Sequence, residues 1–214
     1  MAKYIDMPLQ HINSVMLKRM HRLGDRRAIE MLVERIRARI PGVTFRTAFI
    51  VGFPGETDQV FEELKRYVEE AEFDRVAAFL YSDEEGTPAA GFPEKIGRPV
   101  MDERRNELLA VQETIAAAKN AERIGSTLDV LVDGPAQEAG HWLEGRHEGL
   151  APEIDGVVYF NRLDEATRVP TAGEWIKVSI SDAATYDLTG HVVGETSTAQ
   201  PERPGEHRPR GGYR

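Results

Sequence analysis

The stretch TFRTAFIVGFPGET, residues 44–57, decides the fold class. Its first eight residues are almost all β-branched, aromatic or aliphatic, which predicts a strand buried on both faces. The glycines and the proline of residues 52–55 predict a tight turn, and Thr57 can cap a helix that continues to about residue 72. A buried strand that turns directly into a helix is the repeating unit of a parallel α/β sheet.

Similar units flank this stretch on both sides. Apolar periodicity and turn residues predict two further strands and three further helices, at residues 4–9, 14–24, 25–40, 75–81 and about 101–123. Ser14 and Asp25 are the expected N-caps of the first two helices. The resulting order, β-α-α-β-α-β-α, predicts a parallel sheet covered by helices, and three strands amount to about half of a barrel or of an open sheet.

The pattern changes after residue 123 to short strands separated by Gly, Pro and Asp. Four strands are expected at residues 127–132, 156–160, 175–181 and 187–193, which predicts a small all-β barrel. Residues 196–214 consist mostly of Pro, Gly, Arg, Glu and other polar residues, so we expect a disordered tail there. The expected domains are therefore residues 1–123, 124–195 and 196–214.

Composition and charge exclude several classes of protein. The 214 residues carry a formal net charge of -9, which argues against a protein that coats nucleic acid by bulk charge. Residues 124–195 hold 13 Asp and Glu against 4 Lys and Arg, so the expected barrel would attract a basic partner. No apolar stretch is long enough to span a bilayer, and we expect a cytoplasmic protein without membrane contact. The chain has no cysteine, which excludes disulfides and thiolate-held iron–sulfur clusters within it.

The carboxyl ends of the predicted parallel strands mark the expected ligand site, because these ends meet at one edge of such a sheet. They bring Gln10 and His11, the turn at residues 52–56, and Tyr81 and Ser82 toward one another, and Gln10, Gly52, Phe53 and Tyr81 are the candidate ligand contacts among them. The glycine turn either lets backbone amides approach a ligand or only reverses the chain. Arg46 lies inside an apolar strand, so its guanidinium must reach a carboxylate, a ligand or the rim of the sheet. The six histidines show no metal-ligand spacing, so no protein-only metal site is expected.

Four stretches in combination resemble the radical S-adenosylmethionine methylthiotransferases. They are PLQH at 8–11, RTAFIVGFPGET at 46–57, FDRVAAFLYSDEEGTPAA at 73–90 and the closing β-domain, and the resemblance covers about residues 3–195. Within the family, YIDMPLQH and APEIDGVVY (residues 151–159) look like the branch that methylthiolates an aspartate of small-subunit ribosomal protein twelve. The resemblance implies the C-terminal half of a radical SAM domain, which is a partial TIM-like barrel, followed by a TRAM barrel.

The resemblance also implies cofactors that this chain does not hold by itself. Members of the family use S-adenosylmethionine and two [4Fe-4S] clusters, and the cysteines that bind both clusters are absent here. We therefore expect a truncated or split gene product that is inactive without a cysteine-bearing N-terminal half. Two alternatives stay open. One is a fragment of the tRNA-modifying branch, whose last domain is usually more basic, and the other is a non-catalytic module that only docks on the ribosomal protein.

Matching positions imply roles for individual residues. Gln10, Arg46 and Tyr81 would contact the ribose, carboxylate and adenine regions of S-adenosylmethionine. Gly52 and Phe53 would shape the turn beside it. The candidates in the barrel for holding the basic ribosomal protein are Trp142, Glu153, Asp155 and Trp175. Either tryptophan could instead fill the barrel core. Neither tRNA nor a membrane is an expected partner.

Overall fold

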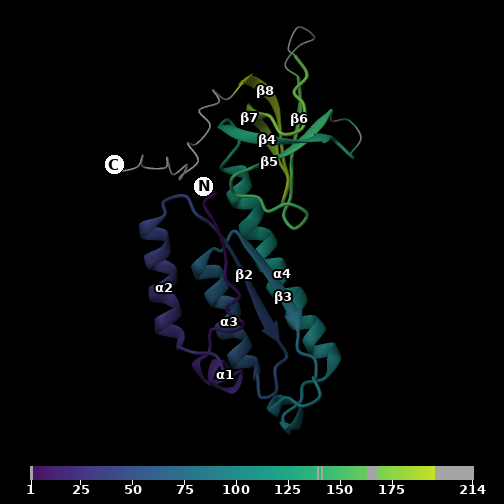
Figure 1. Ribbon diagram of the computed structural model, residues 1–214. Helices are drawn as coiled ribbons and strands as arrows, with labels where there is room; N and C mark the ends of the chain where they lie inside the picture. Colours follow the sequence, from purple (N-terminus) through teal and green to yellow (C-terminus); the bar gives the residue numbers. More distant parts are fainter. Residues whose placement is uncertain (1, 139, 141, 163–167, 196–214) are drawn as a thin grey trace, which may run out of the picture.

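The computed structural model describes residues 2–138, 140, 142–162 and 168–195, and it has two halves stacked end to end (Figure 1). The tail expected at residues 196–214 lies outside the described residues. The α/β half contains β1 (Tyr4–Asp6), α1 (Ser14–Arg19), α2 (Arg26–Arg39), β2 (Thr44–Val51), α3 (Asp58–Ala71), β3 (Arg75–Leu80), the 3-10 helix η1 (Pro88–Gly91) and α4 (Arg98–Ala121). The second half contains β4 (Thr127–Pro135), β5 (Leu143–His147), β6 (Val158–Asn161), β7 (Trp175–Ala183) and β8 (Leu188–Glu195).

Strands β1, β2 and β3 form one parallel sheet in that order, which confirms the predicted parallel α/β arrangement. Asp6, Arg46 and Arg75 are register partners across the three strands. Beyond β1, Gln10 forms one more parallel bridge, to Phe49 of β2. Because all three strands run the same way, the residues that follow them meet at one edge of the sheet.

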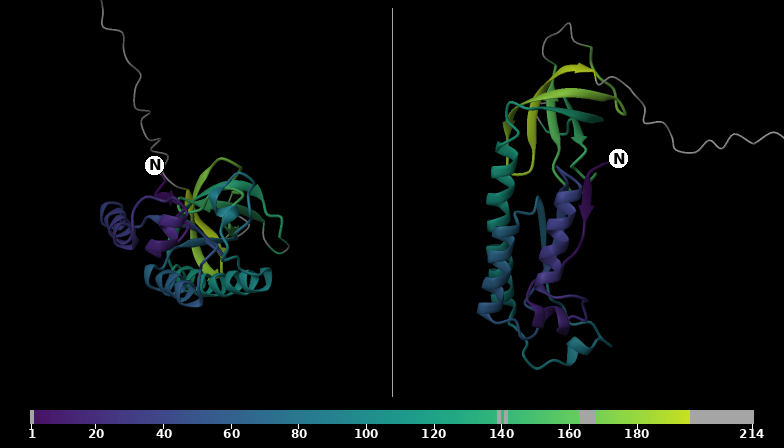
Figure 2. Two further views of the ribbon diagram at one scale, coloured as in Figure 1. Left: turned by 90° about the horizontal axis from the view of Figure 1, so that it is seen from below. Right: turned by 90° about the vertical axis from the view of Figure 1, so that its left-hand side faces the viewer.

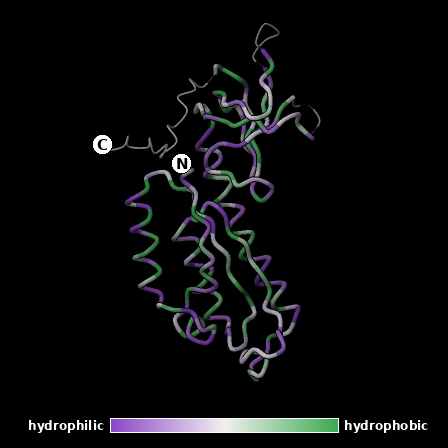
Figure 3. The backbone as a smooth tube through the Cα atoms, in the orientation of Figure 1, coloured by the Kyte–Doolittle hydropathy of each residue, from purple (hydrophilic) through white to green (hydrophobic). Residues whose placement is uncertain are grey.

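Helices α2, α3 and α4 cover one face of this sheet. Phe45 and Phe49 of β2 belong to the same core cluster as Val33 of α2, Leu64 of α3 and Leu108 of α4. Along α2, hydrophilic and hydrophobic residues alternate with the turns of the helix (Figure 3), as expected for a helix that buries one stripe. The core of the α/β half therefore lies between the sheet and its helices.

The opposite face of the sheet is less covered. Side chains alternate along a strand, so Arg46 and Ile50 of β2 and Phe79 of β3 point away from the helices. Phe79 is 57% exposed, which is unusual for a phenylalanine within a parallel strand. Strands β1 and β3 are also the two edges of the sheet. This half therefore presents an open face and two open edges.

The predicted barrel is confirmed, with one more strand than expected. It closes in the order β4-β5-β6-β8-β7, and all neighbours are antiparallel except β6 and β8. The unpredicted strand is β5, whose charged residues Glu144 and Arg146 alternate with the buried Leu143 and His147. The core contains apolar side chains from every strand, including Val130, Leu143, Phe160, Ile176 and Leu188.

The barrel sits at the amino-terminal end of the sheet (Figure 2). The hydroxyl of Tyr4, at the start of β1, donates to Asp155 Oδ2 at 2.7 Å. Arg75, at the start of β3, has its Nε 3.7 Å from Asp155 Oδ1. Near the end of α4, the side-chain amide of Asn120 donates to the carbonyl oxygens of Ala184 and Thr185. Helix α4 thus runs from the carboxyl edge of the sheet to the barrel.

Two helix starts differ from the sequence-based expectation. The N-cap of α1 is Asn13 and not Ser14, because the Asn13 side chain accepts the N–H groups of Val15 and Met16. Helix α4 begins at Arg98, earlier than expected, because Pro99 fits the first turn, where no N–H is needed. The caps expected at Asp25 and Thr57 are confirmed. Among the described helices, none has the length and apolar content that crossing a bilayer requires.

Candidate functional site

A cavity of about 450 Å³ opens at the carboxyl ends of the three parallel strands. Gln10 after β1, Phe53 after β2 and Tyr81 after β3 all line it, together with the exposed Phe79. The charged and imidazole side chains in the lining are Arg19, His21, Arg22 and Glu84. The structure therefore brings three of the five predicted cofactor residues into one pocket.

Gln10 adopts a backbone conformation that is costly for a residue with a side chain. Its φ is 70°, in the left-handed region. Its N–H donates to the carbonyl of Ala48 at 2.9 Å, and its own carbonyl accepts the N–H of Ile50 at 2.8 Å. The neighbouring strand therefore holds Gln10 in place, and strained residues of this kind tend to cluster at ligand sites.

Aromatic rings form one wall of the pocket. The ring of Phe53 lies edge-on to Tyr81, with centroids 5.1 Å apart, and 6.2 Å from the ring of Phe92. The Tyr81 hydroxyl donates to Asp83 Oδ1 at 2.8 Å, and Asp83 also pairs with Lys95. Burial raises the pKa of Tyr81, and the hydrogen bond to Asp83 raises it further. The wall therefore offers uncharged ring surface that suits a planar, partly apolar ligand.

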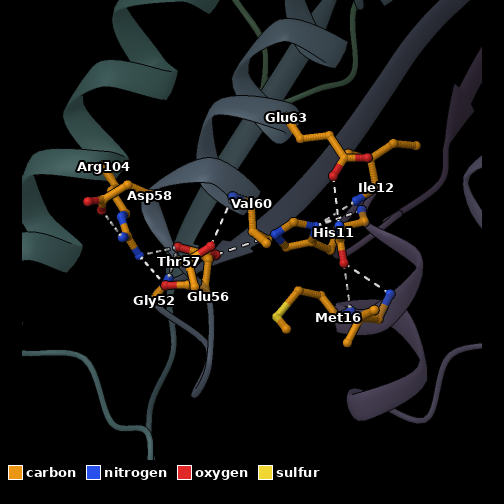
Figure 4. A network of polar contacts seen from close by, with 12 residues as sticks. His11, Ile12, Met16, Gly52, Glu56, Thr57, Asp58, Val60, Glu63 and Arg104 are labelled. Atoms are coloured by element: carbon orange, nitrogen blue, oxygen red, sulfur yellow. Dashed lines mark hydrogen bonds and ion pairs between the residues drawn. The ribbon is translucent and has the colours of Figure 1, made fainter.

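The turn at Gly52 leaves no room for a side chain. Gly52 has a φ of 78°, and a Cβ built there would lie 2.4 Å from Cγ of Met101 on α4. Its N–H donates to Glu56 Oε1 at 3.0 Å, so the carboxylate closes the turn from inside (Figure 4). Gly52 is therefore needed both for its backbone conformation and for the close approach of α4.

Glu56 is the centre of a buried polar network (Figure 4). Arg104 of α4 donates through Nη1 to Glu56 Oε1 at 2.8 Å and to the Glu56 carbonyl at 3.0 Å. On the other side, His11 Nε2 lies 3.4 Å from Glu56 Oε2. His11 Nδ1 accepts the N–H groups of Ile12 and Asn13, so the ring proton is on Nε2 and faces the carboxylate. The network ties the turn after β1 to the turn after β2 and to α4.

The sequence places Glu56 at the expected ligand site only as the last residue of the turn at 52–56, and it assigns no individual role to Glu56 or Arg104. The signal for Glu56 was an acidic residue directly after a buried strand and a glycine turn, where a carboxylate can accept the N–H groups of the turn. Arg104 gave no such signal, since it lies 48 residues further along the chain in a helix rich in charged residues. Neither residue lines the pocket. Both instead hold in place the turn that carries the pocket residue Phe53.

Arg46 lies apart from the pocket. It shares a face of β2 with the pocket residue Ile50, but it is four residues, or about 13 Å, closer to the amino end. Its Nη1 pairs with Asp6 Oδ2 at 2.5 Å, across to β1. Of the three alternatives expected for this arginine, the structure shows the carboxylate, that of Asp6.

The candidate residues of the barrel fall into two groups. Trp142 and Trp175 are 50% and 42% exposed, so neither fills the barrel core. The guanidinium of Arg162 lies 4.1 Å from the ring centre of Trp142. Glu153 is exposed, whereas the Asp155 side chain is buried and bonded to Tyr4. Asp155 therefore joins the two halves, and only the other three face solvent.

Comparison with known proteins identifies relatives over most of the chain. Residues 124–193 match the family model of the TRAM domain. A protein of Anaeromyxobacter sp. (strain K), named ribosomal protein uS12 methylthiotransferase RimO, is 48% identical over 192 residues, 90% of this chain and 40% of the relative. Proteins of the same name from Myxococcus xanthus and Aquifex aeolicus are 41% and 44% identical over 94% and 87% of this chain, which cover 41% and 42% of those relatives.

The chain matches the C-terminal part of RimO. It spans about two fifths of the length of these RimO relatives. Among solved structures, coproporphyrinogen III oxidase (HemN) from Escherichia coli, whose title calls it a radical SAM enzyme, aligns with 68% of this chain and 39% of its own at 15% identity. Its TM-score is 0.46.

An iron–sulfur cluster of the radical SAM type does not fit this RimO-like chain. Thiolates hold such clusters, and the chain has no cysteine. Within the part of the chain that the structure describes, no three His, Asp or Glu side chains lie together so that they could hold a metal ion. A cluster that works at this pocket would have to be held by residues outside these 214.

Proposed function

We propose that this chain is the C-terminal part of a radical S-adenosylmethionine methylthiotransferase. Its target would be the β-carbon of an aspartate in ribosomal protein uS12, in the cytoplasm. The observation that carries the proposal is the identity of 48% to a protein named uS12 methylthiotransferase over 90% of this chain. The pocket supports it, since ligands of parallel α/β folds bind at the carboxyl ends of the strands.

The pocket suits the nucleoside part of S-adenosylmethionine. Its volume of about 450 Å³ is in the usual range of small-molecule sites. Phe53 and Tyr81 offer ring surface to adenine, and the Gln10 amide can donate to and accept from ribose hydroxyls. When bound, S-adenosylmethionine supplies hydrogen-atom abstraction and a transferable methyl group. The residues of this chain bind and orient it and exclude water around it.

We propose that residues 1–123 are the C-terminal half of a partial TIM-like barrel. The parallel sheet has three strands, and β1 and β3 are both edges. Phe79 is exposed on the face away from the helices, where a complete barrel would have its interior. An N-terminal polypeptide that adds strands beside β1 would cover this face and bring the cluster cysteines. Without it, the chain would not catalyse the reaction.

Residues 124–195 would be the TRAM barrel that holds the ribosomal protein. This segment has 13 acidic and only 4 basic residues, and this negative charge favours a basic partner and disfavours tRNA. Trp142, Trp175 and Glu153 are exposed and available for such a contact. Exposed tryptophans are frequent anchors of protein interfaces because they bury a large area with few rotatable bonds.

The proposal is tested by supplying the missing part. The 214-residue chain is mixed with the cysteine-bearing N-terminal three fifths of the Anaeromyxobacter relative, and the clusters are reconstituted without oxygen. We expect the mixture, but neither piece alone, to replace one hydrogen of uS12 by a methylthio group, as read by mass spectrometry. A uS12 variant with the target aspartate replaced by alanine serves as the control substrate.

Binding gives a second readout that does not depend on turnover. S-adenosylmethionine should bind the mixture, and Phe53→Ala should weaken this binding by about tenfold, because it removes the ring wall. Modification of tRNA instead of uS12 would assign the chain to the tRNA branch. A stable chain that binds uS12 but gains neither clusters nor activity from the N-terminal piece would identify a non-catalytic docking module.

A further inference from the structure

A second cavity lies between α2 and α3, on the outer side of the helix layer. Its volume is about 220 Å³, and it shares no residue with the pocket at the carboxyl ends of the strands. On α2 the lining is Glu30, Val33, Glu34 and Arg37, and on α3 it is Tyr67, Glu70 and Ala71. These spacings place one stripe of each helix face to face. We call this cavity the α2–α3 groove.

The groove carries more negative than positive charge. Arg26 pairs with Glu30 at 2.6 Å and with Glu70 at 3.4 Å. Glu34 has no ion-pair partner within the described residues. Arg37 turns its Nη2 to the carbonyls of Ala71 and Glu72, at 2.5 and 3.2 Å, and so caps the end of α3. One carboxylate therefore remains without a cation in contact.

Tyr67 is the second, independent sign of a ligand. Its side chain lines the groove although the residue is only 3% exposed, and its hydroxyl has no hydrogen-bond partner within the described residues. Burial raises the pKa of Tyr67 to about 12, so the hydroxyl stays neutral at neutral pH. A buried hydroxyl without a hydrogen-bond partner reduces the stability of the fold unless a ligand or a water molecule forms a hydrogen bond with it.

We propose that the α2–α3 groove binds an organic cation, an ammonium or guanidinium group on an apolar stem. The positive group would lie between the Glu34 carboxylate and the Tyr67 hydroxyl, and the stem would lie against Val33 and Ala71. An organic cation fits better than a metal ion, because no three His, Asp or Glu side chains of the described residues could hold a metal here. The cation could come from a free polyamine or from a Lys or Arg side chain.

Titration calorimetry on the 214-residue chain at low salt tests this site. The probes are N-acetyl-arginine amide, the corresponding citrulline amide, which has nearly the same shape but no charge, and spermidine. We expect saturable binding of the cations and at least about tenfold weaker binding of the citrulline compound. Tighter binding of spermidine would point to a polyamine as the source, and tighter binding of the arginine compound would point to a protein side chain.

Three variants separate the groove from general charge effects. Tyr67→Phe and Glu34→Gln should each weaken binding about fivefold, since each removes one hydrogen-bonding partner. Glu69→Gln makes the same charge change on α3 outside the groove and should leave affinity unchanged. The proposal is overturned if no cation binds saturably, if the citrulline compound binds equally well, if Glu69→Gln weakens binding as much as Glu34→Gln, or if Tyr67→Phe leaves affinity unchanged. Circular dichroism of each variant confirms that it is folded.

Discussion

Arg104 on α4 and Glu56 after the glycine turn make two hydrogen bonds, one to the Glu56 carboxylate at 2.8 Å and one to its carbonyl at 3.0 Å. The same carboxylate oxygen accepts the N–H of Gly52. One buried arginine therefore fixes both the side chain and the backbone of the residue that closes the turn. Because Phe53 follows Gly52, this pair sets the position of the aromatic wall of the pocket.

Glu56→Ala should lower the free energy of unfolding by about 3 kcal/mol, because it leaves the Arg104 guanidinium buried without its main partner. Asp58→Ala is the matched control. Asp58 pairs with the same arginine at 2.6 Å, but its side chain is 96% exposed, so the loss should be below about 1 kcal/mol. Urea unfolding monitored by circular dichroism measures both values. Equal losses for the two variants would contradict the role given to the buried carboxylate.

Gly52→Ala should cost at least about 2 kcal/mol of stability, since it combines a left-handed φ with a contact to Met101 that is too short. Gly42→Ala provides the comparison, because Gly42 has a similar φ of 75° and no atom within 4 Å of a Cβ there. We expect about 1 kcal/mol for Gly42→Ala. Denaturant unfolding gives the loss in the free energy of unfolding for each variant. The difference between the two losses is the energetic cost of the close contact between residue 52 and α4. No difference would mean that Met101 moves aside freely.

The local parts of the fold were predictable from the sequence because their signals are local. The run of apolar residues in β2, the glycine turn and the Thr57 cap all lie within fourteen neighbouring residues. Strand β5 is not predicted from the sequence, because LEGRH places two charged residues and a glycine in five positions, which is typical of a loop. Its pairing partners on β4 and β6, and not its own residues, make it a strand.

The candidate site was predictable only where a residue directly follows a strand. Gln10, Phe53 and Tyr81 meet because parallel strands end at one edge, which the β/α order already implies. Contacts between segments that are distant in the chain cannot be predicted from the local pattern of a single sequence. Arg104 lies 48 residues from Glu56, and Asp155 lies 151 residues from Tyr4. The motif alone therefore predicts a partner surface for Asp155, whereas the structure shows that this residue joins the two halves.

Asp155→Asn should loosen the junction between the halves. The carboxylate accepts the Tyr4 hydroxyl at 2.7 Å and the N–H of Ala151 at 2.9 Å, and it faces Arg75. We expect a loss of about 2 kcal/mol and two separate thermal transitions in place of one. Glu153→Gln changes an exposed carboxylate in the same loop and should alter stability by less than about 0.5 kcal/mol. A single transition at unchanged temperature for Asp155→Asn would contradict this role.

His147 should make the protein less stable in mild acid. Burial, with help from Arg123 and Arg75, lowers the pKa of His147 from 6.5 to about 4. Between these two values the unfolded chain binds a proton that the folded chain does not, so the free energy of unfolding falls as the pH falls from 6.5 to 4. The full effect is roughly 3 kcal/mol.

His147→Asn isolates this contribution to the pH dependence. An asparagine oxygen can replace Nδ1, which accepts the N–H of Gly149 at 3.0 Å, and it does not titrate. Denaturant unfolding of both proteins between pH 7 and about pH 4 gives the comparison. The variant should lose less stability over this range than the original chain. Identical slopes would show that the imidazole is protonated equally in both states.

Helix α4 sets a fixed distance between the pocket and the barrel. Its first turns lie against Gly52 and Glu56 beside the pocket, and its last turn touches the barrel through Asn120. An unbroken helix of 24 residues is about 36 Å long. An extended polypeptide needs at least about 11 residues to cover that distance. If the proposed function holds, a protein substrate that is bound by the barrel and modified at the pocket has to extend well beyond its reacting residue, and a short peptide around that residue would occupy only one of the two places.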